Sequence, residues 1–194
     1  MKKISLNEDG FTGLEAAIVL IAFVVVAAVF SYVVLGAGFF TTQQSQKTVT
    51  SGVQQASSSL QTLGSVYGIV DGNDTTISEV RFTIGLPAGG SDIDMSKATV
   101  TYADSLILEQ VDFDTVSGTA VAGNWTVYEV INEQGTANDE IETNEQFVIS
   151  VGLPTTATVE AYDEFTIELK PNVGAVLSIT KSAPAGLDAI NVLS

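Results

Sequence analysis

The chain lacks cysteine and histidine altogether among its 194 residues. Without cysteine it has neither a disulfide nor a thiol nucleophile. Without histidine it lacks the commonest general base and the commonest metal ligand. Serine–histidine and cysteine–histidine catalysis are therefore excluded, as are zinc sites built on these residues. We expect no catalytic residues, no cofactor and no bound metal.

Positive charge is also scarce. Seven lysines and arginines stand against 23 acidic residues, so the net charge is −16. Twenty of the acids lie between Asp71 and Asp188, together with only four basic residues. Such an acidic surface repels nucleic acid and anionic lipid, and we expect neither as a binding partner. The sequence leaves open whether this surface reflects a salt-rich environment or is an ordinary solvated one.

The most informative feature that is present is an apolar run, Phe11–Phe40, in which Glu15 is the only charge. Its 30 residues exceed the ~20 that cross a bilayer. A short polar leader ending at Gly10 precedes it, so we predict that residues 1–10 are a processing signal that is cut off after Gly10. Cleavage creates an α-amino cation on Phe11, which would pair with the Glu15 carboxylate, a group that is costly to bury in lipid without a partner.

The helical pattern extends beyond this run. Uncharged residues continue to Gln46, and apolar residues then recur at alternating spacings of four and three, at Val49, Val53, Ala56, Leu60 and Leu63. This stripe is typical of packed helices, and we predict one helix over residues 11–63. A helix that is apolar on every face must be buried on every side. A bundle of identical helices would provide that burial.

Residues 64–194 change to a two-residue alternation broken by turn residues. Residues 171–174 (Pro-Asn-Val-Gly) predict a hairpin turn between the last two strands. Seven or eight short strands at this spacing predict an antiparallel, immunoglobulin-like β-sandwich, so that the whole chain is of the α+β class. The expected strands are Val80–Leu86, Ala98–Tyr102, Ser105–Val111, Trp125–Ile131, Gln146–Val151, Thr158–Tyr162, Phe165–Lys170 and Ala175–Lys181.

Two segments of the chain resemble the archaeal flagellins (archaellins), which belong to the type IV pilin superfamily and carry a class III signal peptide. The first is MKKISLNEDG-FTGLEAAIVLIAFVVVAAVF and its continuation over about 60 residues, in which Gly10, Glu15 and the TGLEAAIVLIAFVVVAAVF block are highly specific. The second, FTIELKPNVGAVLSITKSAP, is similar to the closing hairpin of the family. Family leaders usually place basic residues before the glycine, where this chain has Glu8 and Asp9.

The resemblance implies a structural subunit without catalytic activity. Such a subunit is inserted in the membrane as a precursor, cut after Gly10 by a prepilin-type signal peptidase, and polymerised with identical or paralogous archaellins through its N-terminal helix. The extracellular filament is rotated for swimming by an ATP-powered motor and assembly platform at its base. Two rivals remain open, namely an adhesive archaeal type IV pilin and a monomeric membrane-anchored binding domain. An enzyme is a distant third.

Two Asn-x-Thr sequons begin at Asn73 and Asn124. Two matches are about what chance gives for this composition, so their number alone indicates nothing. Both asparagines follow a glycine, and archaellins are commonly N-glycosylated, so the resemblance implies that both are modified.

Two pairs of aspartates, Asp92/Asp94 and Asp112/Asp114, have the spacing that places carboxylates on one face of a strand. A cation could bind there. Since neither pair lies in a complete calcium-binding loop, solvated acidic side chains are the stronger interpretation.

Overall fold

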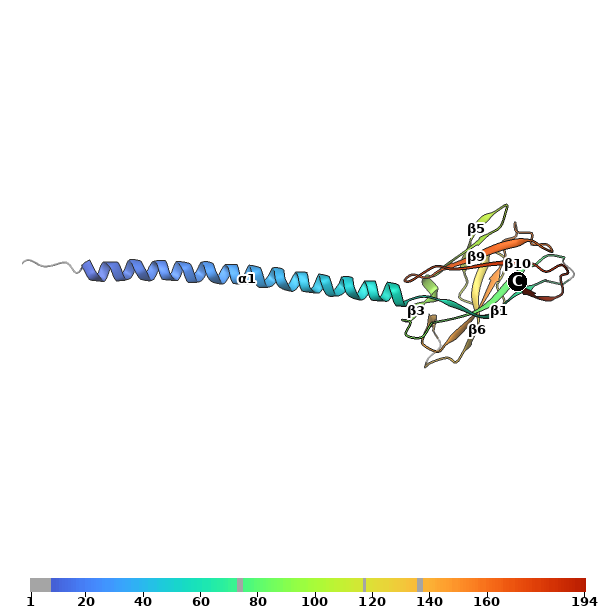
Figure 1. Cartoon of the computed structure of the whole chain (residues 1–194), viewed down its shortest axis with the longest axis horizontal. Helices are drawn as coiled ribbons and strands as arrows, with labels where there is room; N and C mark the ends of the chain where they lie inside the picture. The colour runs from blue at the N-terminus through green and yellow to red at the C-terminus, as the bar shows by residue number, and fades with distance from the viewer. Residues whose placement is uncertain (1–7, 73–74, 117, 136–137) are drawn as a thin grey trace, which may run out of the picture. The chain divides into compact units, whose positions relative to one another are not determined.

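A computed structural model describes residues 8–72, 75–116, 118–135 and 138–194 (Figure 1). The chain divides into two compact units, of which the second is Gly52–Ser194. Helix α1, Glu8–Ser57, makes up the whole described part of the first unit, and its last six residues belong to the second. We call Gly52–Ser194 the β-domain. The two units are described separately.

Helix α1 is continuous over 50 residues. It contains no proline, and the glycines inside it do not interrupt its assignment as helix. In its polar part, which begins at Thr41, threonine hydroxyls donate to carbonyls four residues earlier, as in Thr41 to Ala37 (2.8 Å) and Thr48 to Gln44 (2.9 Å). Because these hydroxyls find partners inside the helix, its polar part does not depend on another segment to satisfy them.

The predicted helix end at Leu63 is wrong. The helix ends at Ser57, and strand β1 already begins at Gln61. A run of three serines, residues 57–59, lies at this junction, and serine hydroxyls compete with helical hydrogen bonds. Leu60 is buried in the core of the β-domain, and Leu63 pairs with Thr83 on the neighbouring strand. The apolar stripe therefore passes from a helix into a strand without a change in spacing.

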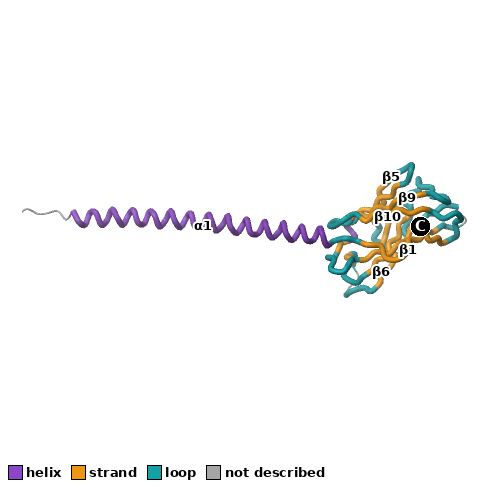
Figure 2. The backbone as a smooth tube through the Cα atoms, viewed as in Figure 1, coloured by secondary structure: helices purple, strands orange, loops and turns teal. Residues whose placement is uncertain are grey.

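Nine strands form one hydrogen-bonded sheet in the order β10-β9-β4-β5-β6-β8-β2-β1-β11, and β3 pairs with β7 separately. Figure 2 shows the strands of the β-domain in orange, joined by loops in teal. Neighbours in the large sheet are antiparallel except β5 and β6, which pair in parallel at Asp112–Asn124 and Phe113–Trp125. A short 3-10 helix, Met95–Lys97, follows β3. The strands are β1 Gln61–Ile69, β2 Glu79–Gly85, β3 Ile93–Asp94, β4 Thr99–Ala103, β5 Leu108–Phe113, β6 Asn124–Ile131, β7 Glu140–Ile141, β8 Gln146–Gly152, β9 Glu164–Lys170, β10 Leu177–Ser182 and β11 Ile190–Leu193.

The prediction of a long apolar helix followed by a β-domain is confirmed, but individual strands differ. The expected strand Thr158–Tyr162 forms only an isolated bridge, between Val159 and Ile77. A turn follows at once, because the Asp163 carboxylate accepts from the Glu160 N–H (2.9 Å) and Tyr162 has a positive φ of 69°. Strands β1, β3, β7 and β11 were not expected from the sequence.

Strand β1 escapes prediction because it contains glycines. Gly64 has φ +80° and lies where the pairing with β2 shifts register, between Leu63 and Tyr67. This is the backbone conformation that glycine supplies at a bulge. At Gly68 the neighbouring side chains leave little room, since an added Cβ would lie 2.8 Å from the Ile77 Cδ1 atom.

The two halves of the sheet share one core. The half containing β4 and β9 contributes Tyr102 and Phe165, whose rings stack with centroids 6.0 Å apart. The half containing β2, β6 and β8 contributes the fully buried Phe82, Trp125 and Phe147. Alternate residues of β4, β9 and β11 are buried, as expected for strands with one buried face, whereas β6 and β8 also contain consecutive buried residues.

The two outermost strands of the sheet approach each other at one end. Ser182, at the end of β10, donates its N–H to the Ser194 carbonyl oxygen (3.0 Å), and the Ser194 N–H is 3.4 Å from the Ser182 carbonyl oxygen. Their hydroxyl oxygens are 3.1 Å apart. The β5–β6 pair therefore joins the two halves of the sheet on one side. The contacts between Ser182 and Ser194, which we call the seam, join them on the other.

We expect Tyr102 to make the β-domain sensitive to alkali. Burial, and then the hydrogen bond that its hydroxyl donates to Asp104 (2.9 Å), raise the pKa of Tyr102 well above its ordinary value. Above a pH of about 10 the unfolded chain releases this proton while the folded chain keeps it. The free energy of unfolding is therefore unaffected below that pH and falls above it, by at most about 1.4 kcal/mol per pH unit.

Urea unfolding of Gly52–Ser194 at several pH values would measure this slope. Tyr102→Phe should be less stable at neutral pH by about 1 kcal/mol, because the hydrogen bond to Asp104 is lost. Above a pH of about 10, its free energy of unfolding should fall less steeply with pH than that of the wild type, by the contribution of one proton. An unchanged slope would contradict the assignment, and Tyr162→Phe, at an exposed tyrosine, is the control.

Candidate assembly surface

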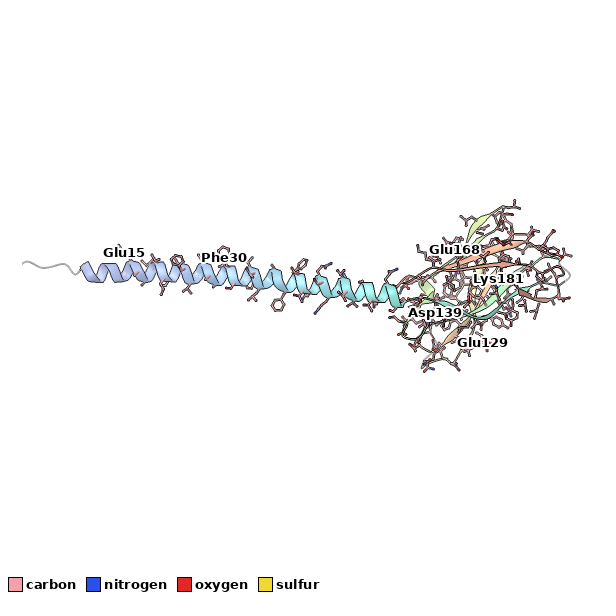
Figure 3. All side chains as sticks on the ribbon, in the orientation of Figure 1. Glu15, Phe30, Glu129, Asp139, Glu168 and Lys181 are labelled. Atoms are coloured by element: carbon pink, nitrogen blue, oxygen red, sulfur yellow. The ribbon has the colours of Figure 1, made fainter. Side chains whose placement is uncertain are left out.

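The surface of α1 is apolar and exposed. Every large apolar side chain from Leu14 to Val53 is between 51% and 79% exposed in the single chain. Figure 3 shows Phe30 and Glu15 among the side chains that surround this helix. From Leu14 to Phe40 the apolar residues follow one another so closely that no polar face is left. Exposed apolar area costs about 25 cal/mol per Å² in water, so this surface requires a partner.

Glu15 is the charged exception on this surface. It is the only Asp, Glu, Lys or Arg between residues 11 and 46, and its side chain is exposed. Gly10 and Phe11 lie in the first turn of α1, so the helix begins before the predicted cleavage point. Phe11 and Glu15 are four residues apart, which places them on the same face about one turn apart. The described helix Gly13–Gln55 is long and apolar enough to cross a membrane.

At four positions in α1, no contact within the chain explains why the residue is glycine. A Cβ added at Gly13, Gly36, Gly38 or Gly52 would meet no atom within 4 Å outside the adjoining helical backbone. Glycine inside a helix costs about 1 kcal/mol relative to alanine. Small residues on apolar helices allow the backbones of neighbouring helices to approach closely. These positions therefore fit contact with another helix better than they fit the isolated chain.

The second predicted glycosylation site, Asn124, is the first residue of β6 and is half-buried. Its sequon partner Thr126 is buried, and the Thr126 hydroxyl donates to the Val116 carbonyl oxygen (2.7 Å). In the folded domain the threonine hydroxyl of the sequon is therefore already hydrogen-bonded and shielded from solvent. The other predicted site, Asn73, lies outside the described residues.

A buried polar network holds the loop that precedes Asn124. The Ser150 hydroxyl donates to the buried Glu79 carboxylate (2.6 Å) and accepts from the Ala120 N–H (2.9 Å). Arg81 forms an ion pair with Glu79 and donates to the Thr119 hydroxyl (3.1 Å). These contacts fix the loop against β2 and β8, and the sequence alone gave no sign of them.

One aspartate of each pair makes local contacts in the structure. The Asp94 carboxylate accepts from the Ser96 N–H (3.0 Å) and pairs with Lys97, so it caps the 3-10 helix. The hydrogen bond from Lys97 lowers the pKa of Asp94. Asp114 likewise accepts from the Val116 N–H (3.0 Å). Within the described residues, no group of three or more acidic side chains is placed to hold a metal ion.

A family model described as archaeal-type flagellin matches residues 10–181. The chain belongs to the archaeal-type flagellin family. It is similar to Probable flagellin 1 of Archaeoglobus fulgidus, with 43% identity over 197 residues and 96% of both chains covered. The family membership expected from the two resembling segments is thereby confirmed.

Solved structures agree with the fold of this flagellin. One, described as the archaeal flagellum of Methanospirillum hungatei, matches with a TM-score of 0.73 and 32% identity, and covers 94% of this chain and 99% of the other. A crystal structure of an archaeal flagellin from Methanocaldococcus jannaschii matches with a TM-score of 0.60 and 19% identity, and covers 69% of this chain and 95% of the other. The second likeness shows the fold alone.

Proposed function

We propose that this flagellin is a structural subunit of an archaeal flagellum and polymerises with identical or paralogous copies through α1. The observation that carries the proposal is a long helix whose large apolar side chains are all more than half exposed, in a chain similar to the subunit of a flagellar filament. A bundle of such helices buries apolar surface on every side, which neither water nor the single chain can do. The four unexplained glycines allow the helices of the bundle to pack closely.

The acidic β-domain would serve the filament as a solvated outer part. Like-charge repulsion between β-domains would keep neighbouring filaments apart and soluble. In this role the subunit needs no catalytic residues and no cofactor. The motor and assembly platform that turn the filament are proposed partners, and filaments imaged on the cell surface would test the extracellular location.

We further propose that the chain is made as a membrane-inserted precursor and that a prepilin-type signal peptidase cuts it between Gly10 and Phe11. The junction separates the polar leader from the apolar helix, which would remain in the mature subunit. Until assembly, the bilayer is the environment that accepts α1. The acidic residues Glu8 and Asp9 precede the cut.

Mature subunits isolated from filaments should begin at Phe11. Gly10→Leu should leave full-length precursor in the membrane, because a bulky side chain at this position would keep the scissile bond out of the peptidase site. N-terminal sequencing and gel mobility measure both, and Gly13→Leu, three residues beyond the junction, is the control for cleavage. Assembled filaments whose subunits still carry Lys2 would contradict the proposal.

Asn73 and Asn124 remain proposed glycosylation sites. The intact mass of the same isolated subunits would show whether one or both are modified. If Asn124 is modified, its glycan must be added before β6 joins the sheet, since the Thr126 hydroxyl is bonded and buried afterwards.

A further inference from the structure

The turn between β9 and β10 contacts the end of α1, and these contacts lie wholly within the β-domain. The Ala175 N–H donates to the Ser58 carbonyl oxygen (3.2 Å), and the Gln55 amide Nε2 donates to the Gly174 carbonyl oxygen (3.3 Å). Ser58 is only 2% exposed. A residue of the helix and the first residue after its end are thus hydrogen-bonded to a turn that lies more than 115 residues further along the chain.

Gly174 is the closest point of this contact. Its φ is +111°, which side chains rarely allow. An added Cβ would lie 1.7 Å from the Ser58 carbonyl oxygen and 2.6 Å from the Ser58 carbonyl carbon. Both atoms belong to the backbone, so no side-chain rotation relieves the overlap. Among the described glycines, this is the shortest approach.

Two further contacts hold the same short segment. The Ser57 and Ser91 hydroxyl oxygens are 3.2 Å apart, so the turn before β3 also touches the end of α1. Leu60, three residues beyond the helix, is buried in the core. Residues 58–60 are the covalent link between α1 and β1, so force that passes along the chain from the helix to the sheet crosses this segment.

We propose that the β9–β10 turn is a clamp on the end of α1, with Gly174 as its positioning residue. The clamp would let force carried along the packed helices reach the β-domains without peeling the linking segment off the sheet. The mechanical role rests on the proposed function. The contacts that make up the clamp lie within the β-domain and do not depend on that function. Gly174 in the Pro-Asn-Val-Gly-Ala turn is then needed for the close approach to Ser58, and not merely for a tight turn.

The test is Gly174→Ala in the full-length chain, made in cells and also purified in detergent. In detergent we expect the Ala175 amide to exchange its hydrogen about tenfold faster, with strand amides at the centre of the sheet unchanged. In cells we expect the precursor to be cleaved normally, but filaments to break into shorter pieces under shear. Gly118→Ala is the matched control, since Gly118 also has positive φ (+130°) but open space around its Cβ position.

A second variant guards against the case in which Gly174→Ala unfolds the β-domain. Gln55→Leu removes one hydrogen bond to the turn without backbone strain, and should speed exchange at residues 55–58 by a few-fold. Unchanged exchange at Ala175 in a folded Gly174→Ala chain, or at residues 55–58 in Gln55→Leu, would overturn the clamp. Faster exchange with unchanged shear resistance would overturn its mechanical role. Failure of the wild-type chain to form filaments would instead refute the proposed function.

Discussion

Glu15→Gln subunits should lose their leader normally and yet form short filaments or none. If the chain is cut after Gly10 as proposed, the new α-amino group on Phe11 is a cation one helical turn from Glu15, and no other acidic residue remains before Asp71. Inside a bundle of apolar helices, glutamine would leave that cation without an anion. Breaking a buried ion pair costs on the order of 3–5 kcal/mol, and the loss recurs in every subunit.

Filament length by electron microscopy and swimming in soft agar would measure the effect. Glutamine has nearly the same size as glutamate, so lost packing cannot explain a defect. Glu15→Asp keeps the charge on a shorter side chain and should assemble better than Glu15→Gln. Filaments of normal length in the Glu15→Gln strain would show that helix carbonyls or water satisfy the amine, and the proposed pair would then be wrong.

The second large effect concerns the division of the chain. A fragment comprising Gly52–Ser194 should be a soluble, β-rich monomer that never polymerises. It contains the eleven strands of the described residues, the shared core and the end of α1 that contacts the β9–β10 turn, and it omits the apolar part of the helix. Sedimentation and circular dichroism would test both statements. Filaments made by this fragment would refute assembly through α1.

The starting residue of such a fragment matters. A shorter fragment beginning at Gly64, where the sequence alone places the boundary, would lack the buried Leu60 and the β1 residues that pair with Thr83, Ile84 and Gly85. Loss of a buried leucine side chain alone costs about 2–5 kcal/mol. We therefore expect the Gly64 fragment to unfold at clearly lower urea concentration than Gly52–Ser194, and equal stability would show that this first part of β1 contributes nothing.

The parts of the fold that the sequence predicts are those with a strong local pattern. The apolar run of α1 is one, and the alternation in Phe82/Ile84 and Phe165/Ile167 is another, because all four side chains are buried in the shared core. Seven of the eight expected strands correspond to strands in the structure, with ends that differ by up to three residues.

What the sequence missed depends on contacts between distant residues. Nothing near Gly64 and Gly68 distinguishes a bulged strand from a linker, since only the pairing with β2 and the packing of Ile77 decide it. Gly174 is predicted as a turn residue, but its approach to Ser58 requires the folded sheet. The candidate site shows the same limit, because Glu15 stands out in the sequence while its proposed partner exists only after cleavage.

The seam between Ser182 and Ser194 has a consequence for a protein that is displayed in many copies. An open strand edge offers unpaired backbone groups to the edge of another molecule, and crowded copies of one sequence are prone to join in this way. Here the outermost strands are short, at six and four residues for β10 and β11, and hydrogen bonds between the two serines occupy part of their edges. This would hinder strand pairing between neighbouring β-domains and the aggregation that follows from it. Contacts between copies would then be made by the helices.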